Sequence, residues 1–177
     1  MNKVHILRYD PSIDKISLRE LILKFEEEVE FKRKIHPSEK DRIHRSIDAM
    51  FENFENDKGT CYVASWNNYI LGFLTLHEYN NSASEIIKPG DIEFSKAYLH
   101  PKARGKGIGY ALNNQAIYDI KQERKEGMNY NRIISTIENT QTENIRLKTE
   151  KFGFRLIANS TYNSKGRIYS TYAKRLR

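Results

Sequence analysis

One hexapeptide just past the middle of the chain constrains its fold most: Arg104-Gly105-Lys106-Gly107-Ile108-Gly109. It follows residues 92–99, whose composition is typical of a β-strand, and it precedes apolar residues at helical spacing. The glycines at 107 and 109 permit unusual φ and ψ angles and let a ligand approach the backbone closely. The helix behind them directs free N–H groups and a positive dipole end toward an anion. The turn therefore predicts a pyrophosphate site, to which Arg104 and Lys106 add positive charge.

Two other phosphate-binding loops fit this stretch less well. The P-loop pattern requires a lysine and then a serine or threonine after its second glycine, but Ile108 follows Gly107. The Rossmann fingerprint has three spaced glycines near the start of a βαβ unit, whereas this turn lies past the midpoint of the chain. A basic, glycine-containing surface turn without a ligand remains an alternative for the hexapeptide alone.

Length and composition favour one soluble domain over residues 1–177, which is long enough to bury a sizeable core. No apolar run approaches the roughly 20 residues that cross a membrane. The N-terminus lacks the apolar region of a secretory signal. The single cysteine, Cys61, excludes an internal disulfide, offers no metal spacing and lies in a strand-like run. We therefore expect a cytoplasmic protein with no membrane segment and no metal site.

Charge is distributed unevenly along the chain. Residues 1–100 carry 14 basic and 17 acidic side chains, and residues 101–177 carry 16 basic and 6 acidic ones, for a net charge of +7. A basic half that includes the candidate phosphate turn suits a polyanionic small molecule. It would equally suit a nucleic acid. The alternative is a solvated basic surface that has no partner.

Hydrophobic periodicity divides the chain into strands and helices. Strands are predicted over residues 3–9, 60–66, 69–78, 92–99, 132–137, 154–160 and 167–173. Helices are predicted over residues 15–31, 43–54, 108–126 and 141–151, the last opened by a capping box over residues 140–143. The strand, helix and strand from 92 to 137 form a βαβ unit, so these two strands should be parallel.

The order of these elements resembles the GNAT family of acyl-CoA N-acyltransferases. A strand ending Tyr98-Leu99-His100-Pro101 and then Arg104-x-x-Gly107-x-Gly109 matches the family's Gln/Arg-x-x-Gly-x-Gly/Ala signature. A later helix ending Glu150-Lys151-Phe152-Gly153-Phe154 is similar to the family's second motif. The resemblance implies an α/β (α+β) fold: a mixed, mostly antiparallel central sheet with flanking helices and a splayed pair of parallel strands.

The resemblance also implies how acetyl-CoA would be held as co-substrate. Backbone N–H groups of Gly105, Lys106, Gly107, Ile108, Gly109 and Tyr110 would bind the pyrophosphate, with Arg104 at the turn. The backbone of Ala97, Tyr98 and Leu99 would pair with the pantetheine arm. Asn144 or Asn139 could bond that arm, although neither stands at the family's usual spacing. Ordinary capping and turn hydrogen bonds are the alternative for both.

Glu93 is the candidate general base, because the family often places a carboxylate on the strand before the glycine turn. Ser95 holds the alternative family position, and both residues should share one strand face with residues 97 and 99. An exposed glutamate paired with a lysine is the competing interpretation. Thr149 occupies the position of the family's usual tyrosine acid. Either another tyrosine serves, or the thiolate leaves unaided, or the chain does not catalyse this reaction.

These features predict an N-acetyltransferase that moves acetyl from acetyl-CoA to a primary amine on a small molecule or a protein. The acceptor pocket is expected between residues 15–31, 80–91 and 160–170. The alternative is a binding or regulatory module of the same fold that associates with nucleic acid and transfers no acetyl group. A homodimer is a further implication of the resemblance.

Overall fold

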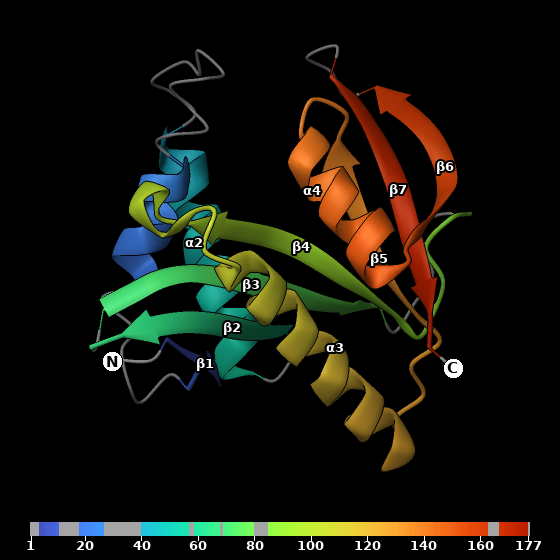
Figure 1. Ribbon diagram of the computed structural model, residues 1–177, viewed down its shortest axis with the longest axis horizontal. Helices are drawn as coiled ribbons and strands as arrows, with labels where there is room; N and C mark the ends of the chain where they lie inside the picture. Colours follow the sequence, from blue (N-terminus) through green and yellow to red (C-terminus); the bar gives the residue numbers. More distant parts are fainter. Residues whose placement is uncertain are drawn as a thin grey trace. The chain divides into compact units, whose positions relative to one another are not determined.

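The computed structural model describes residues 4–10, 18–26, 40–56, 59–67, 69–79, 85–162 and 167–176. The strands are β1 (His5–Arg8), β2 (Gly59–Trp66), β3 (Tyr69–Tyr79), β4 (Asp91–Leu99), β5 (Arg132–Glu138), β6 (Arg155–Tyr162) and β7 (Ile168–Arg175) (Figure 1). The helices are residues 18–26, α2 (Lys40–Glu55), α3 (Ile108–Lys125) and α4 (Thr142–Arg146). A 3₁₀ turn covers Pro101–Ala103, and a π-helical turn covers Leu147–Lys151.

The seven strands form one sheet in the order β1-β2-β3-β4-β5-β7-β6. The pairs β1/β2, β5/β7 and β6/β7 are antiparallel, and β4/β5 is parallel, as the βαβ interpretation predicted. The parallel ladder joins Asp91–Glu93 to residues 132–134, although β4 continues to Leu99 and β5 to Glu138. The predicted fold class, a mixed and mostly antiparallel sheet with flanking helices, is confirmed.

One compact unit consists of residues 1–75 and 96–115. In it, helix 18–26 and α2 pack apolar side chains against β2, β3 and the end of β4. The helical residues spaced at three or four positions are the buried ones, as the periodicity predicted. Cys61 is 2% exposed, which agrees with a buried strand thiol. The buried side chains at the centre of this core are Leu18, Ile22, Ile47, Phe51, Phe73 and Tyr98.

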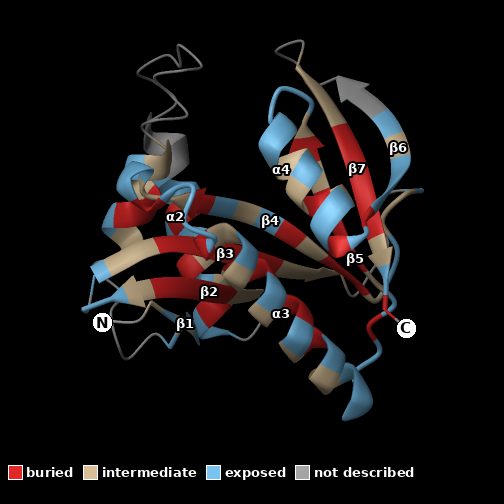
Figure 2. Cartoon of the chain, viewed as in Figure 1, coloured by how far each residue is buried: buried red, intermediate tan, exposed pale blue. Residues whose placement is uncertain are grey.

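The second compact unit consists of residues 76–95 and 116–177. Its buried apolar side chains come from β5, from the first half of β4 and from the second half of α3. Along α3, buried and exposed residues alternate at helical spacing, so that the helix has one buried stripe (Figure 2). Gly127 ends this helix with a φ of 108°, as a glycine stop signal predicts. No helix among the described residues is long and apolar enough to cross a membrane.

The predicted helix 141–151 differs from the structure at both of its ends. The capping box is wrong: Gln141 is the N-cap residue, and no side chain caps the first turn. From Leu147 to Lys151 the backbone is π-helical, whereas the prediction assumed α-helical spacing. In helix 18–26, Glu26 is mostly buried, with 15% of its side chain exposed, and it accepts a hydrogen bond from Lys96 Nζ at 2.6 Å. Residues 27–31 of the predicted N-terminal helix, and residues 163–166 between the last two predicted strands, lie outside the described residues.

Candidate functional site

The glycine turn leads from β4 through the 3₁₀ turn into the first residues of α3. Gly105 and Gly107 have φ angles of 73° and 75°, which a residue with a side chain rarely adopts. A Cβ atom built on either glycine would meet no other atom within 4 Å. Open space therefore adjoins the backbone of both residues, as close approach by a ligand requires.

Backbone N–H groups at the start of α3 lie at the same turn. The first helical bond runs from the Ala111 N–H to the Gly107 carbonyl, at 3.0 Å. N–H groups before that point have no preceding helical turn to bond to. The Asn113 amide donates to the Gly109 carbonyl at 2.7 Å, which strengthens this first turn. An anion at the turn would accept hydrogen bonds from these N–H groups, and the helix dipole would stabilise its negative charge.

Arg104 supports the turn through contacts with its own strand. Its Nε donates to the Leu99 carbonyl at 3.0 Å, and its guanidinium lies 5.4 Å from the centroid of the Tyr98 ring. Lys106 is exposed, and so is Ala97. The absence of a side chain at Gly72 of β3 lets the end of β4 lie close to it. A Cβ atom at Gly72 would lie 2.6 Å from the Tyr98 carbonyl oxygen, which is too close.

Glu93 accepts a hydrogen bond from the Tyr79 hydroxyl at 2.8 Å. The competing interpretation, a glutamate paired with a lysine, does not describe this contact. Burial and the adjacent Glu93 carboxylate raise the pKa of Tyr79, so the phenol retains its proton. His77 packs edge-on against the Tyr79 ring, with centroids 4.7 Å apart. A half-buried carboxylate with one orienting donor keeps lone pairs for a second proton donor.

The remaining predicted residues form local contacts. Ser95 is exposed, on the same face of β4 as Glu93. Asn139 accepts from the Ser170 hydroxyl at 2.8 Å, and Asn144 donates to Gln141 Oε1 at 3.3 Å. The Thr149 hydroxyl donates to the Ile145 carbonyl at 2.9 Å, one turn earlier. The hydroxyl hydrogen of Thr149 is therefore used in a hydrogen bond within the helix.

Tyrosines were the other candidates for the general acid. Tyr98 and Tyr172 are buried, and the Tyr130 hydroxyl donates to Glu78 Oε1 at 2.9 Å. Tyr169 is half-buried, and the side chain of Tyr162 lies outside the described part of the chain. His100 has a structural role, since its Nδ1 accepts a hydrogen bond from the Lys102 N–H at the 3₁₀ turn. Among the described residues, no cluster of histidine, cysteine, aspartate and glutamate could hold a metal ion.

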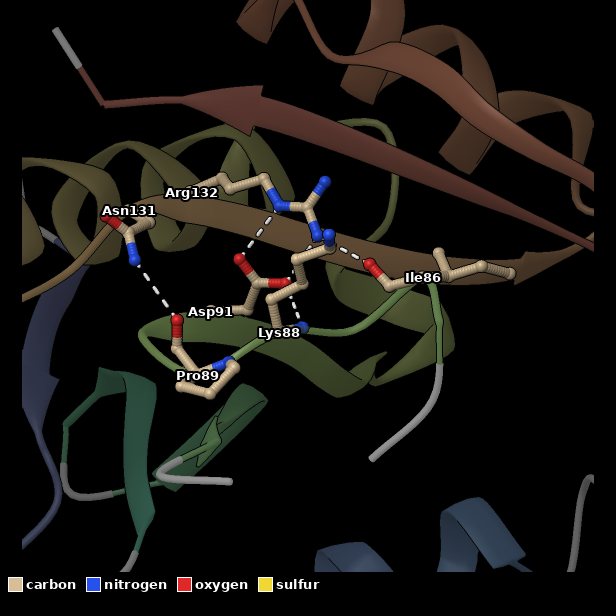
Figure 3. Close-up of polar contacts among 6 residues, drawn as sticks. All are labelled: Ile86, Lys88, Pro89, Asp91, Asn131 and Arg132. Carbon is tan, nitrogen blue, oxygen red and sulfur yellow. Dashed lines mark hydrogen bonds and ion pairs between the residues drawn. The ribbon is translucent and has the colours of Figure 1, made fainter. Parts of the chain in front are cut away.

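Sequence reasoning missed a buried ion pair that fixes the start of the parallel ladder. Asp91 is fully buried and receives Arg132 Nε at 2.8 Å and Nη2 at 2.7 Å (Figure 3). The Lys88 N–H donates to the same carboxylate at 2.9 Å, and Arg132 also donates to the Ile86 carbonyl. The hydrogen bonds to the Asp91 carboxylate, and its negative charge, raise the pKa of the Arg132 guanidinium. Since Asp91 is opposite Arg132 in the ladder, the pair sets the register of β4 against β5.

We predict that Arg132→Met lowers the free energy of unfolding by about 3 kcal/mol, because it leaves the Asp91 carboxylate buried without its cation. Urea unfolding followed by circular dichroism measures the change. Arg146→Met is the matched control, since Arg146 pairs with Glu150 on the surface and should change stability by less than about 0.5 kcal/mol. Equal losses in both variants would contradict a structural role for the Arg132 pair.

Lys148, in the π-helical turn, was also missed. It is 3% exposed, and its Nζ lies 4.0 Å from the centroid of Phe94 and 5.2 Å from that of Phe154. Burial lowers the pKa of Lys148 well below that of a lysine in water. A lysine among charged neighbours on a short helix gives no sequence signal of burial.

Lys148→Met is expected to raise the unfolding temperature at pH 7 by about 5 °C, equivalent to about 2 kcal/mol. In the folded chain the low pKa disfavours the protonated amine, whereas the unfolded chain binds that proton up to its ordinary pKa. The lysine's cost to stability therefore falls as pH rises toward 10.5. In calorimetric scans from pH 6 to 10, the difference in unfolding temperature between Lys148→Met and the wild-type protein should become smaller as pH rises. Lys151→Met, at an exposed lysine, is the control. A difference in unfolding temperature between Lys148→Met and the wild-type protein that does not change with pH would refute a lowered pKa for Lys148.

Comparisons with known proteins agree with the motifs. A model of the acetyltransferase (GNAT) family matches residues 21–154. No curated protein matches the chain. An N-acetyltransferase from Staphylococcus aureus Mu50 has a TM-score of 0.73 at 20% identity, covering 99% of each chain.

Two similar structures contain acetyl-CoA. A GNAT family acetyltransferase from Elizabethkingia anophelis with acetyl-CoA bound has a TM-score of 0.62 at 16% identity, covering 99% of this chain and 100% of its own. The yncA protein from Salmonella typhimurium with its cofactor acetyl-CoA has a TM-score of 0.70 at 16% identity, covering 99% of this chain and 95% of its own. At such identities the likeness establishes the fold.

Proposed function

Since the chain belongs to the acetyltransferase (GNAT) family, we propose that it transfers the acetyl group of acetyl-CoA to a primary amine. The observation that carries the proposal is the glycine turn. Gly105 and Gly107, which both have positive φ, border open space just before an 18-residue helix. The acetyl-CoA in the Elizabethkingia anophelis and Salmonella typhimurium structures supports the choice of donor.

Backbone groups are assigned most of the binding. The N–H groups from Gly105 to Tyr110 bind the pyrophosphate, and Lys106 adds charge at the same turn. Arg104 holds the turn against the end of β4 through the Leu99 carbonyl. The backbone of residues 97–99 pairs with the pantetheine arm, and Asn139 or Asn144 contributes one further hydrogen bond. The ladder between β4 and β5 joins Asp91–Glu93 to residues 132–134, and β4 continues beyond it to Leu99.

Glu93 is assigned the role of general base. It accepts a proton from the attacking amine, directly or through one water molecule, while the nitrogen forms a bond to the thioester carbonyl carbon. A backbone N–H of β4 stabilises the negative charge that develops on the carbonyl oxygen. The carbon–sulfur bond then breaks, and the electron pair leaves with sulfur. Tyr79 positions the Glu93 carboxylate through its hydroxyl, and Ser95 lies along the same strand face.

The leaving thiolate takes its proton from solvent in this proposal, because Thr149 donates its hydroxyl hydrogen to the Ile145 carbonyl. If the thiolate is protonated by solvent, turnover should not depend on the hydroxyl group of the residue at position 149, which is a threonine in this chain. Thr149→Val should retain most of the turnover. A loss as large as that expected for a general acid, about 100-fold or more, would contradict this assignment.

Incubation with acetyl-CoA and a panel of amines tests the proposal. The panel contains polyamines, aminoglycosides, free amino acids and lysine peptides. We expect thiol release that depends on one amine class, together with a product heavier by one acetyl group in mass spectrometry. Thiol release without an acetylated amine would indicate hydrolysis of the thioester, and acetyl-CoA binding without either product would favour a binding module.

A further inference from the structure

The second compact unit contains a cavity of about 540 Å³ at the amino ends of β4 and β5. This volume is in the range of small-molecule sites in proteins. Every residue that lines the cavity belongs to this unit, and five of the six have a polar or charged side chain. The lining residues are Lys88, Asp91, Asn131, Arg132, Arg175 and Leu176.

The charges of the cavity lining do not balance. Three cations, Lys88, Arg132 and Arg175, line it against the one carboxylate of Asp91, which gives a net formal charge of +2. The Asp91 carboxylate is fully buried and already paired with Arg132. Neither the Lys88 ammonium nor the Arg175 guanidinium bonds to another residue in the described part of the chain. Two positive charges at this cavity are therefore available to an anion.

Two of the cations face each other across neighbouring strands. Arg132 and Arg175 are directly opposite in the antiparallel ladder between β5 and β7, so their side chains leave the same face of the sheet. Like charges at such positions are destabilising. An anion bound by both guanidinium groups would relieve this repulsion.

Arg132 keeps hydrogen-bond donors for a ligand in spite of its ion pair. Its Nε and Nη2 donate to the two Asp91 carboxylate oxygens, and Nη2 also donates to the Ile86 carbonyl. The other terminal nitrogen, Nη1, points away from Asp91 (Figure 3), and its N–H groups have no acceptor among the described residues. The pair with Asp91 therefore holds in place a guanidinium that still has an edge for an anion.

Asn131 joins the loop before β4 to the end of β7. Its N–H donates to the Gly90 carbonyl at 2.8 Å, and its side-chain amide donates to the Pro89 carbonyl at 3.1 Å (Figure 3). The Asn131 carbonyl accepts from the Leu176 N–H at 3.3 Å. These bonds fix the wall of the cavity before a ligand binds, which lowers the cost of ordering on binding.

We propose that this cavity binds a small phosphate monoester, whose phosphate group contacts Arg132, Arg175 and Lys88. A phosphate monoester carries about two negative charges at pH 7 and three acceptor oxygens, which match the net charge of +2 and the three cations. Arginine suits phosphate oxygens by its planar fork, and lysine suits them as a point charge. The rest of the cavity volume would hold the organic part of the ester.

The proposed site goes beyond acetyl transfer and does not depend on it. None of the lining residues belongs to the glycine turn. Asp91 begins β4, whereas residues 97–99, which are assigned to the pantetheine arm, end it. Inorganic phosphate presents the same recognised group as a monoester, so the experiment includes both.

Isothermal titration calorimetry at constant ionic strength tests the site, with inorganic phosphate and glucose 6-phosphate as probes. Both should bind saturably, and glucose 6-phosphate should bind more tightly, because its sugar also occupies the cavity. Glucose should not bind. Dimethyl phosphate has one negative charge and should bind at least about tenfold more weakly than glucose 6-phosphate. Both phosphate probes should also raise the unfolding temperature, since they bind the folded chain.

Variants test the assigned residues while Arg132 is left unchanged, because its pair with Asp91 supports the fold. Arg175→Gln and Lys88→Gln should each weaken glucose 6-phosphate binding at least about tenfold. Without ligand, Arg175→Gln should unfold at a temperature no lower than the wild-type protein, because it removes a like charge opposite Arg132. Arg155→Gln is the matched control, since Arg155 is exposed on β6 and does not line the cavity.

Acetyl-CoA carries a phosphate monoester of its own, so the titration is repeated with saturating acetyl-CoA, and the affinity for glucose 6-phosphate should not change. Displacement by acetyl-CoA would make the cavity part of the donor site and overturn the proposal. Absence of saturable binding by both phosphate probes would also overturn it, as would unchanged affinity in Arg175→Gln and Lys88→Gln. Tighter binding of inorganic phosphate than of glucose 6-phosphate would overturn the assignment of an ester. The titration without acetyl-CoA does not involve acetyl transfer, so the two proposals can fail separately.

Discussion

Gly107→Trp is expected to weaken acetyl-CoA binding at least about 100-fold, which corresponds to the loss of two hydrogen bonds to a charged group. The reason is geometric. Gly107 has a φ of 75°, and the space where its Cβ would lie is open. An indole ring in that space would fill the volume that the pyrophosphate needs beside the backbone. Isothermal titration calorimetry with acetyl-CoA measures the effect directly.

Gly127→Trp separates lost binding from backbone strain. Gly127 also has a positive φ, of 108°, and also borders open space, but it ends α3 instead of beginning it. Both variants place a large side chain on an unfavourable backbone conformation, so both should lose a similar amount of stability. Only Gly107→Trp should lose acetyl-CoA. If affinity survives in Gly107→Trp, the turn is not the pyrophosphate site.

Glu93→Gln should lower kcat by about 100-fold or more while the affinity for acetyl-CoA stays within a factor of about two. The amide keeps the shape of the side chain and can still accept the hydrogen bond from Tyr79, but it cannot take up the amine's proton. Steady-state kinetics with the best amine, together with calorimetry, separates turnover from binding. The acidic limb of the pH–rate profile should also disappear in the variant.

Two further variants serve as comparisons for Glu93→Gln. Tyr79→Phe removes only the orienting hydroxyl, so it should lower kcat by a smaller factor, about tenfold, and leave the affinity for acetyl-CoA unchanged. Glu150→Gln changes an exposed carboxylate in a surface pair with Arg146 and should have no effect on turnover. An unchanged pH–rate profile in Glu93→Gln would remove Glu93 as the base.

Periodicity and glycine spacing were enough to predict the elements around the turn. The strand before it and the helix that begins at Ile108 were predicted from local patterns. Of the two glycines expected to adopt unusual angles, Gly107 has a positive φ but Gly109 does not, and Gly105 has one instead. The parallel pairing of β4 with β5 followed from the helical crossover between them. These features depend on residues close together in the sequence or on general rules of connection.

Contacts between distant residues could not be predicted in the same way. The hydrogen bond between Tyr79 and Glu93 depends on how β3 aligns with β4, and the Asp91–Arg132 pair joins residues 41 positions apart. The burial of Lys148 could not be predicted, because the π-helical turn that contains it has no signal in the sequence. The capping box failed because Gln141, not Thr140, is the N-cap residue.

Calorimetric titration of acetyl-CoA into the purified protein, at low and at moderate salt, tests the proposed donor site most directly. The account predicts one site with a dissociation constant in the micromolar range, about −8 kcal/mol, that persists when salt is added. Backbone donors at a helix N-terminus are screened less than exposed lysines, so the loss of affinity with salt should be small. No binding at either salt concentration would contradict the account and leave the glycine turn as a structural feature only.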